Sequence, residues 1–141
     1  MPTATTSNRR ALITLALALA AGASTAAQAR QARIMPPAQA SCDRNQLTSW
    51  FGHVVGYRRS AKEIWLRIAT DYGTTEELTL AHTSQANAAT HFLLHGAPFT
   101  AKDWSVIERK PGVLAKGVRA TAWICRDGKT APLIDWNGAA E

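Results

Sequence analysis

The middle of the chain alternates apolar and polar residues with the period of a β-strand. Ile64, Leu66 and Ile68 share one face of a strand over residues 64–69, and the residues between them share the other. Residues 50–59 are rich in aromatic and β-branched side chains, and residues 78–80 repeat the alternation after a glycine-containing turn. These three segments are predicted to form a meander of three strands.

Residues 84–95 break the alternation and predict a helix. This segment is alanine-rich, Ser84 can cap its start, and Gly96 can end it. A second short helix is expected over residues 100–108, before Pro111. Helical structure is therefore expected after the third strand.

Residues 118–125 and 133–136 return to the strand pattern, with a hairpin signal at Asp127-Gly128 between them. Three strands, helical structure and two strands is the element order of the OB-fold, a Greek-key barrel. Gly52 and Gly56 fit the bend, bulge or close backbone approach that a closed first strand needs. An open α+β sheet matches the same order but leaves these glycines unexplained.

The fold class expected is therefore mainly β: a five-stranded OB-like Greek-key barrel with one or two short helices between strands 3 and 4. This domain is expected to span residues 42–138.

The first 29 residues have the features of a secretory signal peptide. Arg9 and Arg10 precede an apolar run at residues 11–21, and Ala27 and Ala29 supply the small residues that signal peptidase requires. The paired arginines also fit a twin-arginine signal, so the export route stays open. The apolar run is short for a membrane span, and none is expected after cleavage. Periplasmic or secreted localisation follows.

Residues 30–41, which include Pro36-Pro37, are predicted to form a flexible arm between the signal peptide and the domain. Cys42 and Cys125 are the two cysteines of the chain, and neither belongs to a Cys-x-x-Cys motif. In an oxidising compartment they are predicted to form a structural disulfide, with a redox or metal site as the alternative. The loop closed by this disulfide would contribute roughly 4 kcal/mol in the chain-entropy model.

The net charge of +6 is concentrated at the N-terminus. From Cys42 onward the chain has 12 Lys and Arg residues against 10 Asp and Glu residues, because Arg9, Arg10, Arg30 and Arg33 precede it. The domain is nearly neutral, so nucleic acid is not expected as a partner.

Several short motifs resemble small exported bacterial proteins with OB-like domains of unknown function. They are Gly52-x-Val54, Thr70-Asp71, Trp123-Ile124-Cys125-x-Asp127-Gly128 and Ile134-Asp135-Trp136. The resemblance covers residues 50–136 and implies the fold and the compartment. It carries over no catalytic residue, because the family is uncharacterised.

The outer face of the predicted barrel is the main candidate for ligand binding. If Leu66 and its neighbours point inward, Trp65, Arg67, Arg119 and Trp123 point outward. OB-folds bind oligosaccharides and oligonucleotides with such aromatic and cationic surfaces. The alternative is that both tryptophans pack beneath a helix, the arm or a partner chain. A non-enzymatic binding or interaction module of the bacterial envelope is expected, with a glycan, peptide or protein as partner.

A metal-binding protein is the alternative function. His91 and His95 are four residues apart in the predicted helix, a spacing at which two imidazoles can bind copper or zinc. Surface or helix-end histidines explain the same pattern. No nucleophile is paired with a base at a recognisable spacing and no glycine-rich phosphate loop occurs, so neither enzyme activity nor a cofactor is expected.

Overall fold

The structure, a computed structural model, describes residues 35–139. The signal peptide expected at residues 1–29 and the first part of the expected arm lie outside the described residues. Where the chain is described, no helix has the length and apolar character needed to cross a membrane.

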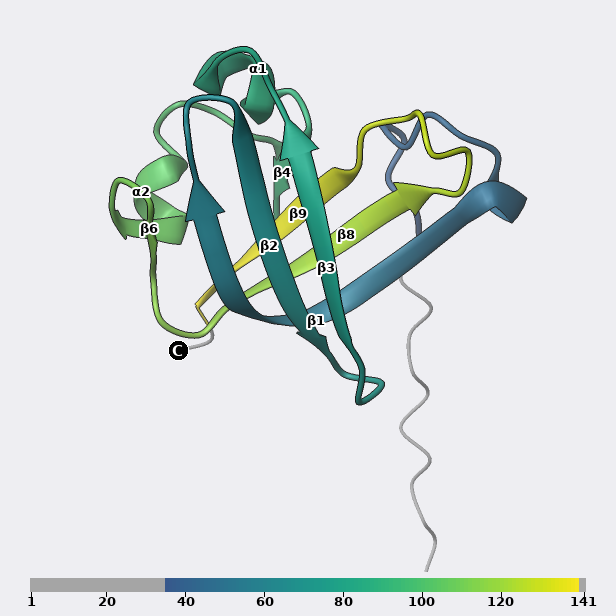
Figure 1. Cartoon of the computed structure of the whole chain (residues 1–141), viewed down its shortest axis with the longest axis horizontal. Coiled ribbons are helices and arrows are strands. Elements are labelled where there is room, and N and C mark those ends of the chain that lie inside the picture. The colour runs from purple at the N-terminus through teal and green to yellow at the C-terminus, as the bar shows by residue number, and fades with distance from the viewer. Residues whose placement is uncertain (1–34, 140–141) are drawn as a thin grey trace, which may run out of the picture. The chain divides into compact units, whose positions relative to one another are not determined.

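The fold is mainly β, as predicted, and most of its strands belong to one seven-stranded sheet (Figure 1). The strand order in this sheet is β3-β2-β1-β8-β9-β4-β5, and β6 and β7 form a separate two-stranded sheet. All pairs in both sheets are antiparallel except β4 with β9. The elements are η1 (Arg44–Gln46), β1 (Leu47–Arg59), β2 (Glu63–Thr70), β3 (Thr75–Ala81), α1 (Gln85–Ala89), β4 (Phe92–Leu94), β5 (Ala97–Pro98), α2 (Trp104–Ile107), β6 (Glu108–Lys110), β7 (Val113–Leu114), β8 (Val118–Cys125) and β9 (Leu133–Ala139).

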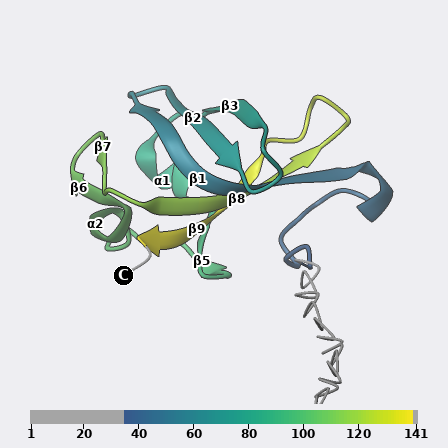
Figure 2. The same ribbon diagram turned by 90° about the horizontal axis from the view of Figure 1, so that it is seen from below.

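Strand β1 is long and bent, and it joins the two halves of the sheet (Figures 1 and 2). Its first half pairs with β8 and its second half with β2, and the two pairings overlap at Gly52 and His53. A bulge follows between Val54 and Gly56. A Cβ on Gly52 would lie 2.0 Å from the carbonyl oxygen of Ala69, so β2 can approach β1 only because this residue is glycine. The expected role of the glycines is confirmed.

The five strands predicted from the sequence correspond to β1, β2, β3, β8 and β9. A closed five-stranded barrel is not observed within residues 35–139, because the edge of β9 that could receive β3 is paired with β4. Strand β3 pairs with β2 alone in the described sheet. The sheet therefore curves but stays open.

The helix predicted over residues 84–95 is wrong in its second half. Ser84 caps α1 by accepting a hydrogen bond from the backbone N–H of Asn87, as expected, but α1 ends at Ala89. Residues 92–94 form β4 and bury Phe92 at 2% exposure. Strand β4 is favoured over a continued helix because it buries Phe92 and Leu93 and pairs its backbone with β9.

The main core lies on the inner face of the curved sheet and includes Leu66, Ile68 and Ala122, as predicted. An aromatic cluster closes it under α2, with Phe92 in edge-to-face contact with the three aromatic rings of Phe99, Trp104 and Trp136. Helix α2 is shorter than the segment 100–108 predicted for it, because residues 101–103 form a turn and residues 108–110 form β6.

A disulfide joins Cys42 to Cys125, as predicted, with their Cα atoms 6.1 Å apart. It attaches the segment before η1 to the end of β8 across 83 residues of sequence. The covalent link therefore fixes the start of the domain to the sheet.

Candidate binding surface

Trp65 lies on the outer face of β2, between two arginine side chains. The Cζ atoms of Arg58 and Arg67 lie 5.4 and 5.2 Å from the centre of the indole ring. Arg58 is the cross-strand partner of Trp65 on β1, and Arg67 is two residues further along β2, on the same face. The arginine side chains are 63% and 47% exposed, so this cluster faces solvent.

The backbone under Trp65 is shaped to receive the indole. Gly56 lies beside it on β1, and a Cβ there would be 2.8 Å from the far edge of the ring. Arg67 is held from the other side by an ion pair of 2.7 Å with Glu77 on β3. The three strands together support one aromatic and cationic surface.

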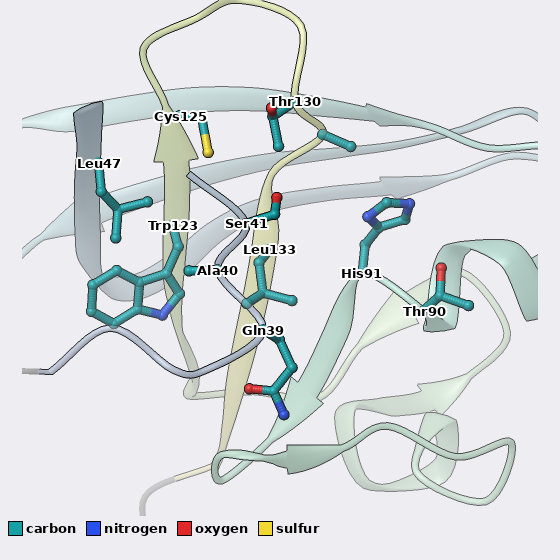
Figure 3. Close-up of a pocket in the computed structure, with 11 residues that line it drawn as sticks. Gln39, Ala40, Ser41, Leu47, Thr90, His91, Trp123, Cys125, Thr130 and Leu133 are labelled. Carbon is teal, nitrogen blue, oxygen red and sulfur yellow. The ribbon is translucent and has the colours of Figure 1, made fainter. Parts of the chain in front are cut away.

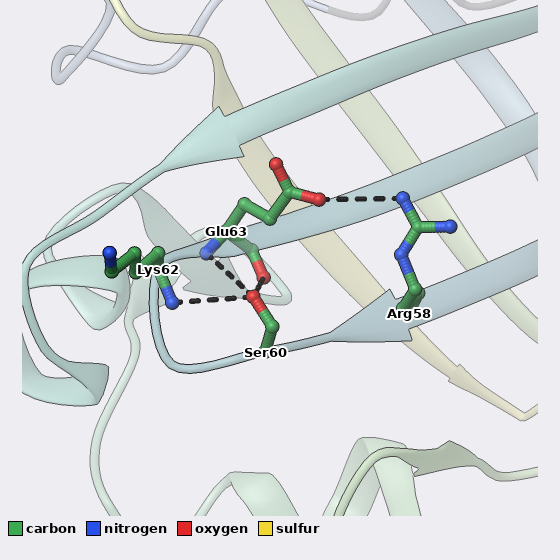
Figure 4. A network of polar contacts seen from close by, with 4 residues as sticks. All are labelled: Arg58, Ser60, Lys62 and Glu63. Carbon is green, nitrogen blue, oxygen red and sulfur yellow. Dashed lines mark hydrogen bonds and ion pairs between the residues drawn. The ribbon is translucent and has the colours of Figure 1, made fainter.

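The hairpin between β1 and β2 orients Arg58 (Figure 4). The hydroxyl oxygen of Ser60 accepts hydrogen bonds from the backbone N–H groups of Lys62 and Glu63 and closes the turn. Glu63 in turn lies 3.4 Å from a terminal nitrogen of Arg58. The turn thus places an acceptor where Arg58 can use it.

Trp123 points away from the main core, as predicted, but the expectation that it is exposed is wrong. Its side chain packs in a second apolar cluster with Leu93 and Leu133, and the residue is 4% exposed. Residues 39–41 of the arm line the same pocket of about 240 Å³, at the end of the sheet (Figure 3). The alternative interpretation named the arm as a possible cover for Trp123, but it did not foresee strand β4.

The four residues predicted to bind a ligand do not form one patch. Trp123 is aligned with Ser49 on β1, and Trp65 with Arg58, nine positions further along the same strand. At about 3.3 Å per residue, roughly 30 Å of the bent strand β1 lies between these two alignment points. Arg119 forms an ion pair with Asp71, and its Cζ lies 4.5 Å from the ring centre of Phe51.

His91 and His95 do not share a helix. Strand β4 lies between them, and four residues in a strand span about 13 Å rather than the 5–6 Å of a helical turn. His91 borders the pocket of Figure 3, and His95 is exposed in a turn with φ of 51°. Within residues 35–139, no three His, Cys, Asp or Glu side chains gather as a metal site would require. Copper or zinc binding stays a prediction, and the helical spacing of His91 and His95 on which it was based is not observed.

A buried polar cluster that sequence reasoning missed lies beneath α2. Arg59 donates a hydrogen bond of 2.6 Å from Nη2 to Glu108 Oε2, and the hydroxyl of Tyr57 donates to Glu108 Oε1. The side chains of Arg59 and Glu108 are 7% and 3% exposed, and the Arg59 Cζ lies 4.3 Å from the centre of the Trp104 ring. Burial, together with the hydrogen bond and charge of Glu108, raises the pKa of Tyr57 above its ordinary value.

The sequence contained part of the signal for this cluster. Tyr57 and Arg59 are two residues apart and share a strand face, so a strand that continues to residue 59 places Arg59 beside the core. Nothing in the sequence connects Arg59 with Glu108, which lies 49 residues away.

No family model matches the chain, and neither a curated protein nor a solved structure has significant similarity to it. The resemblance to small exported bacterial proteins therefore stays a prediction.

Proposed function

We propose that the chain is an exported, non-enzymatic binding module of the bacterial envelope, with an OB-like arrangement of strands. Its ligand is a glycan or a peptide, held on the outer face of β1 and β2. The observation that carries the proposal is the half-buried indole of Trp65 between the exposed guanidinium groups of Arg58 and Arg67.

The chemistry of this surface suits a ligand with a flat apolar face and polar edges. An indole stacks on the apolar face of a sugar ring or on an aromatic side chain, and arginines beside it donate hydrogen bonds to hydroxyl or carboxylate groups. Because Gly56 and Glu77 hold Trp65 and Arg67 in place, binding would order few side chains.

The strand arrangement and the disulfide support the proposed fold and compartment. The order β3-β2-β1-β8-β9 is that of an OB-fold opened between its third and fifth strands. OB-folds use the face of strands 2 and 3 for ligands, and Trp65, Arg67 and Glu77 belong to these two strands. A disulfide between Cys42 and Cys125 is typical of exported proteins and fits the signal peptide expected at residues 1–29.

Co-sedimentation with purified peptidoglycan sacculi tests the proposal, because sacculi present both sugar rings and peptides. We expect the mature protein to sediment with sacculi and Trp65→Ala to bind at least about fivefold more weakly, since stacking contributes about 1–3 kcal/mol. Tyr72→Ala is the matched control, because Tyr72 is an exposed aromatic residue in the turn after β2. Binding equal in wild type and Trp65→Ala, or equally weakened in both variants, would contradict the site.

A further inference from the structure

A basic groove lies on the side of β1 opposite Trp65. It has a volume of about 450 Å³ and is bordered by the end of β1, by α2 and by β6, which group at one end of the sheet (Figure 2). Its charged lining residues are Arg59, Lys102, Glu108, Arg109 and Lys110. Four cations and one carboxylate give the groove a net charge of +3, although the domain as a whole is nearly neutral.

Arg59 is buried in the lining of this groove with unused hydrogen-bond donors. Its side chain is 7% exposed, and its Nε and Nη1 atoms have no hydrogen-bond partner among residues 35–139. These two nitrogens carry three of the five N–H groups of a guanidinium. The stacking of Arg59 on Trp104 offsets part of the cost of burying the positive charge, but it uses no N–H group.

Glu108 does not satisfy the remaining donors of Arg59 in this structure. Each of its two carboxylate oxygens already accepts a hydrogen bond, one from Tyr57 and one from Arg59 Nη2. Buried donors without a partner are unfavourable, and a protein interior normally supplies one. Arg59 lines the groove, so an anion held there would lie beside these donors.

We infer that this groove is a second binding site, specific for the oxyanion group of a small ligand, either a carboxylate or a phosphate. Arg59 donates to the anion from the floor of the groove, and Lys102, Arg109 and Lys110 surround it with positive charge. Trp104 excludes water from one face of the guanidinium and so strengthens the contact. The site is separate from the Trp65 surface and does not depend on the function proposed for it.

Titration of the ¹⁵N-labelled, disulfide-bonded protein with sodium acetate and with inorganic phosphate tests this inference. We expect at least one anion to shift the indole N–H signal of Trp104 and the amides of residues 102–110 in a saturable way. The anion that saturates at lower concentration identifies the ligand as a carboxylate or a phosphate. Absence of saturable shifts with both anions would overturn the inference.

The decisive variant is Arg59→Gln combined with Glu108→Gln, which removes one cation and one anion and keeps the net charge of the groove. We expect at least tenfold weaker binding, because the guanidinium donors are lost. Arg58→Gln removes a cation from the adjacent residue on the other face, and binding should stay within twofold of wild type. Equal binding by the double variant and wild type would mean that the net field alone attracts the anion, and would overturn the site.

Arg59→Lys provides a second test that keeps the charge. Lysine can still pair with Glu108 but lacks the fixed guanidinium fork, so we expect folded protein with about tenfold weaker binding. Anion affinity unchanged in this variant would likewise overturn the role of Arg59, whether or not the double variant folds.

Discussion

Arg58 and Arg59 are adjacent on β1, and each lies against a tryptophan ring and a glutamate, but in opposite environments. The side chain of Arg58 is 63% exposed, its Nη2 lies 3.4 Å from Glu63 Oε1, and its Cζ lies 5.4 Å from the Trp65 ring centre. The side chain of Arg59 is 7% exposed, its Nη2 lies 2.6 Å from Glu108 Oε2, and its Cζ lies 4.3 Å from the Trp104 ring centre. The same three residue types therefore make a solvated surface on one side of the strand and a buried cluster on the other.

The difference teaches that burial, more than residue type, decides what such a cluster contributes. An exposed ion pair contributes about 0–1 kcal/mol, because water and salt screen it. Removing one partner of a buried pair costs about 3–5 kcal/mol, because a charge is left without compensation. The exposed cluster is free to exchange its water for a ligand, whereas the buried one fixes the position of its guanidinium.

The largest expected effect is that of Glu108→Ala, which leaves the buried guanidinium of Arg59 unpaired. We expect the free energy of unfolding to fall by about 3–5 kcal/mol, measured by urea denaturation. Replacing both residues, with Arg59→Met and Glu108→Leu, should recover most of this loss, since no buried charge then remains. A loss below about 1 kcal/mol in Glu108→Ala would show that the two clusters do not differ as described.

The next effect is a loss of stability at high pH through Tyr57. In the unfolded chain its hydroxyl ionises near pH 10, whereas burial and Glu108 keep it protonated in the folded protein by raising its pKa. Above pH 10 the unfolded state therefore binds fewer protons, and stability falls by up to about 1.4 kcal/mol per pH unit.

Comparison with Tyr57→Phe isolates this contribution. By pH 11.5 the wild type should have lost more stability than the variant, by up to about 2 kcal/mol relative to their values at pH 8, in urea denaturation. Parallel pH profiles for the two proteins would mean that Tyr57 is not held protonated by the buried cluster.

A smaller effect is expected from Gly56→Ala on the exposed side. The new Cβ would lie 2.8 Å from the Trp65 ring and 2.9 Å from the Cβ of Arg67, so both must shift. Overpacking of this kind costs about 1–2 kcal/mol. In a double-mutant cycle the cost should be lower in a Trp65→Ala background, and an equal cost in both backgrounds would show that the indole does not rest on Gly56.

The smallest effect is that of Glu63→Ala, the exposed counterpart of Glu108→Ala. Loss of the 3.4 Å contact with Arg58 should change the free energy of unfolding by less than about 1 kcal/mol, and less still in 1 M salt. A loss that approaches that of Glu108→Ala in the same urea assay would remove the contrast between the two sides of β1.

The sequence by itself determined the local parts of this protein and one long-range link, the disulfide. Alternation of Ile64, Leu66 and Ile68 was sufficient to predict β2 and its buried face, because a strand repeats every two residues whatever its neighbours are. The cysteine count was sufficient to predict the Cys42–Cys125 disulfide, because each cysteine had one available partner. The glycines at positions 52 and 56 indicated the bend of β1, because a glycine inside a strand usually marks a bend, a bulge or a close backbone approach.

Only the tertiary structure decided which segments cover which others. Parallel pairing of β4 with β9 replaced both the expected helix around His91 and the closure of the sheet. The strand patterns had made Trp123 and Trp65 equivalent. In the structure β4 and the arm cover Trp123, whereas Trp65 lies at the surface between two exposed arginines. The pairing of Arg59 with Glu108 likewise joins segments far apart in sequence. Such contacts depend on the shape and free edges of the folded sheet, which no local period encodes.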